Sequence, residues 1–277
     1  MNVQAANAKA AATSPALILL REDHDGIAVL TLNRPAARNS LSEALLQALG
    51  DALTAIAHDR NVRVVVLAAT GPAFSAGHDL KELNAHRSDD DRGRAYFKKI
   101  MDMCSAVMQQ IVTLPQPVIA SVQGTATAAG CQLVASCDLA VASAAARFAT
   151  PGVNIGLFCS TPMVALSRNV SRKAAMEMLL TGELITAEDA ARIGLVNHVV
   201  AAGHERAEAL KLAEKIAAKS ALTVKIGKEA FYKQAEMPLA GAYKYAADVM
   251  VENMLARDAE EGISAFIEKR EPTWQDR

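Results

Sequence analysis

The length, composition and charge of the chain limit the class of protein it can form. The chain has 277 residues, of which 51% are hydrophobic and 21% charged. This composition supports a packed core and excludes global disorder. The formal net charge is −1, from 29 Lys and Arg and 30 Asp and Glu. No positive excess is available to neutralise phosphates, so we expect no nucleic-acid partner.

The spacing of the cysteines and the N-terminal residues indicate the cellular compartment in which the protein is expected. The chain has cysteines at Cys104, Cys131, Cys137 and Cys159. None of them forms a CxxC or a Cys/His pair with metal-ligand spacing. We therefore expect reduced thiols, no metal site and a reducing compartment. No apolar run approaches the roughly 20 residues that cross a bilayer, so no membrane partner is expected. Residues 1–15 are rich in Ala and lack a basic, then apolar, signal pattern. We predict a disordered leader on a cytoplasmic protein, with a mitochondrial location as the alternative for a eukaryotic source.

The first predicted elements alternate between strand and helix. Leu17–Leu20 and Ile27–Leu32 are predicted strands joined by a hairpin turn at Asp25-Gly26. Ser40-Leu41-Ser42-Glu43 has a capping-box pattern, in which the Glu43 carboxylate would reach back to the Ser40 amide. The helix that follows is expected to end near Ala57.

Buried strands and long helices dominate the remaining prediction. Val62–Ala69 is apolar without alternation, which indicates a strand covered on both faces. A helix is predicted from about Asp90 to Leu114, and further strands at Val118–Val122, Asp138–Ala142 and Val196–Val200. Helical patterns cover Arg172–Leu180, Ala187–Ile193, Arg206–Lys219 and Ala259–Arg270. The order of elements predicts an α/β fold with a core over residues 16–200 and a C-terminal helical region over residues 201–277.

Two small-residue loops each follow a strand and precede a helix, at Phe74–Leu80 and at Gly124–Gln132. Helix N-termini direct unpaired N–H groups outward, and two such amides that converge would form an oxyanion hole. Asp79 and Glu82 form a capping pair that would anchor the first loop. Neither loop matches a nucleotide-phosphate motif. Tight packing would also explain the small residues, so the loops alone leave the function open.

Several ordered motifs together resemble the crotonase (enoyl-CoA hydratase/isomerase) superfamily. FSAGHDL at Phe74–Leu80 and QGTATAAGCQLVASCD at Gln123–Asp138 are similar to its two oxyanion loops. FATPGVNIG at Phe148–Gly156 and the stretch Leu179–Val200 are similar to later family segments, and EGISAFIEKREP at Glu261–Pro272 is similar to its C-terminal ending. The resemblance covers residues from about 16 to 272. It is greatest to the branch of enoyl-CoA hydratase domain-containing proteins.

The resemblance implies a fold, a ligand and an assembly. The fold would be a spiral of ββα turns followed by helices that form a homotrimer or a dimer of trimers. The ligand would be an acyl-CoA, with no cofactor beyond the coenzyme A thioester itself. The thioester oxygen would lie between the backbone amides of His78 and Ala129. Other ligand-binding positions would be Arg38, Ala76, Asp79 and Leu80, with Arg38 either near a CoA phosphate or simply on the surface.

The chain departs from the hydratase pattern at the acid/base positions. The positions of the two hydratase glutamates are Gln132 and Gly152, and the position of the dienoyl-CoA isomerase aspartate is Ser160. An amide side chain orients a water but takes no proton near neutral pH. His78 is either a packed loop residue or a cation that binds a thioester or carboxylate. Cys159 is expected to be a buried, inert thiol.

Three functions therefore remain open. The first is a nominal enoyl-CoA hydratase/isomerase, a lyase or isomerase of fatty acid metabolism with weak or no ordinary hydration. The second is a decarboxylase of malonyl-type CoA thioesters, and the third is an acyl-CoA-binding protein without catalysis.

Overall fold

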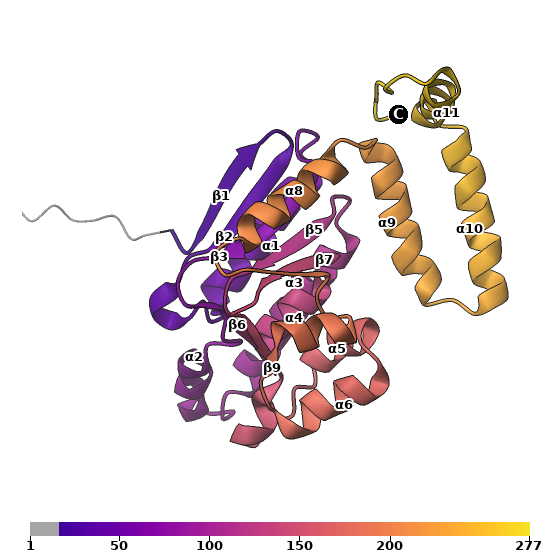
Figure 1. The fold of residues 1–277 in the computed structure, drawn as a ribbon. Helices are drawn as coiled ribbons and strands as arrows, with labels where there is room; N and C mark the ends of the chain where they lie inside the picture. The colour runs from indigo at the N-terminus through magenta and orange to yellow at the C-terminus, as the bar shows by residue number, and fades with distance from the viewer. Residues whose placement is uncertain (1–16) are drawn as a thin grey trace, which may run out of the picture.

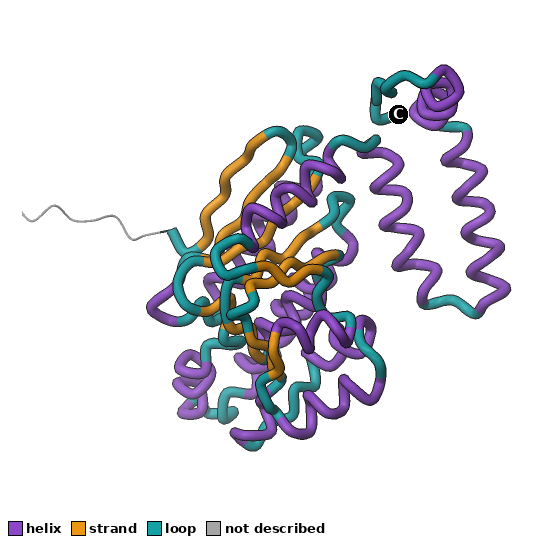
Figure 2. The backbone as a smooth tube through the Cα atoms, viewed as in Figure 1, coloured by secondary structure: helices purple, strands orange, loops and turns teal. Residues whose placement is uncertain are grey.

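The computed structural model describes residues 17–277, so the predicted leader lies outside the described residues. Strands form two sheets, of six and four strands (Figures 1 and 2). The strands are β1 Leu19–His24, β2 Ile27–Leu32, β3 Val64–Ala69, β4 Ala73–Ser75, β5 Val118–Val122, β6 Thr125–Thr127, β7 Leu139–Ser143, β8 Arg147–Ala149, β9 Ile185–Thr186 and β10 His198–Val200. The helices of the first half are α1 Glu43–Ala57, α2 Leu80–Ala85, α3 Arg94–Thr113, α4 Ala129–Ser136 and α5 Pro162–Asn169. Those of the second half are α6 Arg172–Thr181, α7 Ala187–Ile193, α8 Glu205–Ala217, α9 Ala221–Ala235, α10 Leu239–Met254 and α11 Arg257–Glu268. Short 3₁₀ turns are η1 Pro35–Ala37, η2 His86–Ser88 and η3 Pro151–Ile155.

The chain winds between the two sheets in repeated turns. The large sheet has the order β1-β2-β3-β5-β7-β10 and the small sheet the order β4-β6-β8-β9. Each of β3, β5 and β7 is followed by a short strand of the small sheet and then by a helix or 3₁₀ turn. This is the predicted spiral of ββα turns. Because β4, β6 and β8 lie side by side, the segments that follow them meet at one edge of the small sheet.

The large sheet is covered on both faces, as the unbroken apolar run of β3 predicts. Val64 and Val66 face Ala209 and Ala213 of α8, which crosses the sheet in Figure 1. Their neighbour Val65 faces the main core with α1, α3 and α4. A strand buried on both sides needs no polar alternation.

The C-terminal helices stand apart from the sheets. In Figure 1 the hairpin of α9 and α10 extends away from the body, and α11 folds back at its end. No residue of α9 is buried, and large apolar side chains of this region are exposed. They include Phe231, Leu239, Tyr243, Met250, Leu255 and Phe266. Over residues 17–277, no helix combines the length and apolarity needed to cross a bilayer.

Local predictions are confirmed in part. The hairpin turn at Asp25-Gly26 is present, with φ of 48° and 80° at its two residues. The capping box is wrong, because α1 begins one residue after Ser42, whose side chain accepts the Leu45 amide. The Glu43 carboxylate instead pairs with Lys99. Strand β1 continues to His24 as an exposed edge, beyond its apolar first residues.

Candidate functional site

The two small-residue loops are in direct contact. Gly77 has a φ of +90°, and a Cβ placed on it would lie 3.2 Å from the amide nitrogen of Ala129 and 3.0 Å from the Thr127 carbonyl oxygen. Likewise, a Cβ on Gly130 would lie 2.2 Å from the Ser75 carbonyl oxygen. Both positions therefore require glycine, because the backbone after β4 touches the backbone after β6.

The backbone amides at the centre of this contact are unpaired. The Leu41 amide donates to Gly77 O at 2.7 Å and the Asp79 amide to Leu41 O at 3.2 Å, which leaves the intervening His78 amide with no partner among the described residues. The Ala129 amide, first in α4, also has no partner in that part of the chain. A pair of free N–H groups beside a helix N-terminus is the geometry that favours a negatively charged oxygen.

Ala128, which precedes this helix, has a strained backbone. Its φ of 50° and ψ of −120° are unusual for a residue with a side chain. Its own amide donates to Ala149 O on β8 at 2.9 Å, which holds the conformation in place. The strain turns the chain sharply, so that the Ala129 amide is not used by the sheet.

Asp79 supports the first loop. Its carboxylate accepts from Ser40 Oγ at 3.0 Å and Arg34 Nη2 at 3.1 Å, and caps α2 through the amides of Lys81 and Glu82. Burial raises the pKa of Asp79, but these hydrogen bonds outweigh it and hold the pKa below its ordinary value. With its oxygens occupied, Asp79 positions the neighbouring His78 amide. Leu80 is 52% exposed at the start of α2.

The His78 ring is partly buried. Neither ring nitrogen has a hydrogen-bond partner within residues 17–277. Burial lowers the pKa of His78 below its ordinary 6.5, and this effect exceeds the opposing contribution of the Leu41 backbone. The lowered pKa favours a neutral ring over a binding cation, and both interpretations of His78 stay predictions. The ring offers one neutral donor and one acceptor.

Gln132 is a buried amide side chain without a partner. The residue is 4% exposed, and its Oε1 has no hydrogen bond within the described range. It lies one turn after Ala129 on α4, and helical side chains lean towards the N-terminus of their helix. Its side chain is therefore directed towards the free amide end. Leaving such a group unpaired costs about 1–3 kcal/mol, which suits a group that pairs with a ligand or water.

Gly152 is not an empty position. A Cβ on Gly152 would lie 2.8 Å from Leu157 O and 2.9 Å from Cys159 Sγ. The Gly152 amide donates to Cys159 Sγ at 3.3 Å. Burial raises the pKa of the Cys159 thiol, which keeps it protonated. The loop at Leu157–Cys159 thus fills the space that a side chain at residue 152 would need.

A groove of about 540 Å³ adjoins the two loops and brings Arg38 and Ala76 together. Arg38 is exposed and makes no ion pair with any residue from 17 to 277. Thr125, Thr127 and Asn154 also line the groove, although nothing in their spacing singled them out. Thr125 and Thr127 are the two ends of β6, and Asn154 lies in η3.

No group of three or more His, Cys, Asp or Glu side chains in the described chain is arranged to hold a metal ion. The four cysteines are buried free thiols.

Fold and loops together define an α/β spiral with paired free amides at the edge of its small sheet. A family model described as enoyl-CoA hydratase/isomerase matches residues 22–277, and the chain belongs to this family. Among curated proteins, the chain is 48% identical over 262 residues to the mitochondrial enoyl-CoA hydratase domain-containing protein 3 of Mus musculus, covering 95% of this chain and 85% of that protein. The Homo sapiens protein of the same name is 49% identical over 250 residues, covering 90% and 81%.

Solved structures show the same fold. An enoyl-CoA hydratase from Mycobacterium smegmatis has 55% sequence identity and a TM-score of 0.89, covering 93% of this chain and 99% of that one. The human enoyl-CoA hydratase domain-containing protein 3 has 48% identity and a TM-score of 0.89, covering 93% and 100%. These relatives agree with the predicted crotonase branch.

Proposed function

We propose that the protein binds an acyl-CoA with its thioester oxygen between the amides of His78 and Ala129, and that it stabilises the enolate form of the thioester. The observation that carries this proposal is the pair of unpartnered amides in two touching loops. An enolate oxygen gains more from fixed donors and a helix N-terminus than a neutral carbonyl does. Each donor would contribute about 3 kcal/mol to the transition state.

Ordinary hydration of an enoyl-CoA does not follow from this site. Hydration needs a base to activate water and an acid to protonate the α-carbon, and each contributes roughly 10²–10⁴-fold. Gln132 is an amide, residue 152 is glycine, and His78 lies beside the thioester-binding amides. We therefore propose that the protein is a lyase or isomerase of acyl-CoA thioesters, as its family name implies, and that its hydratase turnover is weak or absent.

The remaining ligand contacts are assigned by position. Ala76 and Arg38 line the groove beside the amides, which suits the polar coenzyme A moiety. The free guanidinium of Arg38 fits a phosphate. Leu80 offers apolar surface at the mouth of the first loop, and Asp79 acts by holding that loop.

Substitution of Ala129 by proline tests the amide pair. Proline removes one donor at the first position of α4, but the φ of 50° and ψ of −120° at Ala128 are unfavourable before a proline, so circular dichroism must show that the variant is folded. We expect binding of acetoacetyl-CoA, which forms an enolate readily, to weaken about 10- to 100-fold by calorimetry. Arg172→Pro is the control, because Arg172 is exposed at the first position of α6. Unchanged acetoacetyl-CoA binding by a folded Ala129→Pro variant would refute the assignment.

The side chains of Gln132 and His78 beside the amide pair carry no negative charge. This favours a second candidate function, the decarboxylation of malonyl-type CoA thioesters. Loss of CO₂ leaves the electron pair on the α-carbon as an enolate, which the same amides would stabilise. Gln132 and the neutral His78 do not repel a substrate carboxylate, whereas a glutamate would. Gln132→Glu keeps the side-chain shape and should weaken malonyl-CoA binding at least tenfold while butyryl-CoA binding is kept. If neither thioester is turned over but both bind, the non-catalytic binding protein is the correct function.

Assembly and compartment complete the proposal. The exposed apolar side chains of α9–α11 fit a homotrimer or a dimer of trimers. We keep the division into residues 16–200 and 201–277 as a proposal, with α9–α11 as the assembling part, because α8 within the second range covers the large sheet. The buried free thiols suit a reducing compartment, either the cytoplasm or, for a eukaryotic source, the mitochondrial matrix. Light scattering that gives a monomer at micromolar concentration would contradict the assembly.

A further inference from the structure

Helix α9 is attached to the body of the protein by buried polar groups. None of its residues is fully buried, so little apolar packing holds it. The side chain of Lys228, in the centre of α9, is only 7% exposed and pairs with Asp138, whose side chain is 15% exposed. A charged side chain inserted at such a point needs specific partners.

The partners of Lys228 are complete. Its Nζ donates to Asp138 Oδ2 at 2.7 Å, to Ile111 O at 2.9 Å and to Gln116 O at 3.0 Å. These bonds use all the protons of the ammonium group. The contacts reach the end of α3 and the segment before β5, so a single side chain connects α9 to both.

Asp138 is held from the other side as well. Tyr232 Oη, one turn further along α9, donates to Asp138 Oδ1 at 2.9 Å, and the Val118 amide donates to Oδ2 at 2.7 Å. Burial, and then the nearby Asp138, raises the pKa of Tyr232, so the phenol stays protonated and remains a donor. We call Lys228, Tyr232 and Asp138 the latch.

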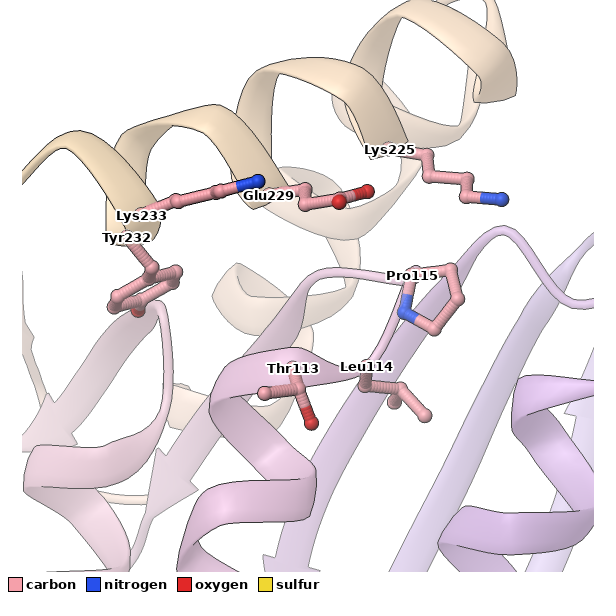
Figure 3. Close-up of a pocket in the computed structure, with 7 residues that line it drawn as sticks. All are labelled: Thr113, Leu114, Pro115, Lys225, Glu229, Tyr232 and Lys233. Atoms are coloured by element: carbon pink, nitrogen blue, oxygen red, sulfur yellow. The ribbon is translucent and has the colours of Figure 1, made fainter. Parts of the chain in front are cut away.

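A cavity of about 530 Å³ lies beside the latch, between α9 and the end of α3. Figure 3 shows Lys225, Glu229 and Lys233 along α9, with Thr113, Leu114 and Pro115 on the opposite side. The helix is therefore not packed tightly against the body here. Hydrogen bonds have direction, whereas apolar contacts do not, so the latch fixes an angle that packing leaves undefined.

A second attachment lies at the N-terminal end of α9. Asp276 in the C-terminal tail pairs with Arg63 at 2.9 Å and accepts from the Ala221 amide at 2.7 Å. Trp274 Nε1 donates to Ala218 O at 2.9 Å. If the latch opened, this end would remain attached and act as a pivot for α9–α11.

Asp138 also connects the latch to the candidate site. It lies two residues after the end of α4, whose first amide is that of Ala129. All eight residues of α4 are buried, and the helix is about 12 Å long. A displacement at one end of such a packed, short helix is transmitted to the other end.

We propose that Lys228, Tyr232 and Asp138 form a latch that sets the angle of the helical arm α9–α11 and couples it, through α4, to the amide pair at His78 and Ala129. The latch residues are positioning residues. The coupling to ligand binding rests on the function proposed above, whereas the control of the arm does not.

The test uses the full chain with two designs. Tyr232→Phe removes one hydrogen bond and leaves the ion pair. Lys228→Met with Asp138→Asn removes both charges together, which avoids leaving one buried charge unpaired. Lys225→Met is the matched control, since Lys225 lines the same cavity on the same helix and makes no hydrogen bond with the described residues.

We expect amide hydrogen exchange in Ala221–Ala235 of the double variant to become at least tenfold faster. The urea midpoint should fall moderately, because the Ile111 and Gln116 carbonyls lose their donor, and exchange in α1 should change less than exchange in α9. Tyr232→Phe should show a smaller increase and Lys225→Met none. The double variant should also assemble heterogeneously by light scattering and bind butyryl-CoA more weakly. If amide hydrogen exchange in α9 were as slow in both latch variants as in wild type, the proposal would be overturned. If wild type itself bound no butyryl-CoA, the proposed function would fail, yet the exchange measurement would still decide the latch.

Discussion

Replacing Gly152 tests the conclusion that its site is already filled. In a Gly152→Ala variant, the new methyl group would lie 2.8 Å from Leu157 O and 2.9 Å from Cys159 Sγ. Both distances are below normal van der Waals contact, and the oxygen belongs to the backbone. Forcing an extra carbon into a packed interior costs about 1–3 kcal/mol. We expect a loss of about 2 kcal/mol in the free energy of unfolding, a factor of about 30 in the unfolding equilibrium.

Urea denaturation at one fixed protein concentration measures this loss, since the stability of an oligomer depends on concentration. The midpoint should fall while the slope stays constant. Gly227→Ala is the control, because Gly227 lies inside α9 with no atom within 4 Å of the added Cβ. That change should be neutral or stabilise by up to about 1 kcal/mol.

Removing the sulfur separates the two contacts. Adding Cys159→Ala to Gly152→Ala should recover part of the loss, because only the contact with Leu157 O then remains. A Gly152→Ala variant as stable as wild type would show that the loop at residues 157–159 moves freely, and the reasoning would fail. A glutamate at residue 152 should then also be accommodated. In that case the combined variant Gly152→Glu with Gln132→Glu should restore hydration.

The other predictions concern reactivity, pH and the support of the loop. Wild-type turnover of crotonyl-CoA to the hydrated product should lie well below the 1–10³ s⁻¹ typical of enzymes in a spectrophotometric assay, and a rate in that range would require a catalytic group other than those described. The pKa of His78 is lower in the folded state than its ordinary 6.5, so the unfolded chain binds the proton more readily. The contribution of His78 to the free energy of unfolding is therefore largest above pH 6.5 and declines as the pH falls below that value. The urea midpoints at pH 7.5 and pH 5.5 should consequently differ less in the His78→Gln variant than in wild type. Asp79→Asn keeps the cap of α2 but loses the ion pair with Arg34, and should weaken acetoacetyl-CoA binding severalfold by calorimetry without a matching loss of helix content by circular dichroism.

Much of the large sheet follows from the sequence because its signals are local. The apolar run at β3 and the turn at Asp25-Gly26 each fix their own structure, and both are confirmed. The small sheet does not follow in this way. Strands β4, β6 and β8 have three residues each, too few for a period to be recognised, and they form only because neighbouring turns of the spiral align them.

The candidate site shows the same division. The glycines at residues 77 and 130 marked the loops that touch, since only glycine permits so close an approach. The sequence could not predict that the space beside Gly152 is occupied. Leu157 and Cys159 fill that space from a loop whose path depends on tertiary packing. The partner of Glu82 was equally hidden. It accepts the Glu43 amide, 39 residues away, where the sequence suggested only the local cap of α2.

The free amides at His78 and Ala129 belong to the main chain, and this gives the site an evolutionary consequence. A side-chain carboxylate can be lost by one substitution, whereas a backbone N–H is removed only by proline or by refolding of the loop. Under the proposed function, recognition of a thioester and the chemistry performed on it can therefore change independently. Within such a scaffold, a substitution at residue 132 can vary the reaction by itself, whereas residue 152 can change only together with the loop at residues 157–159.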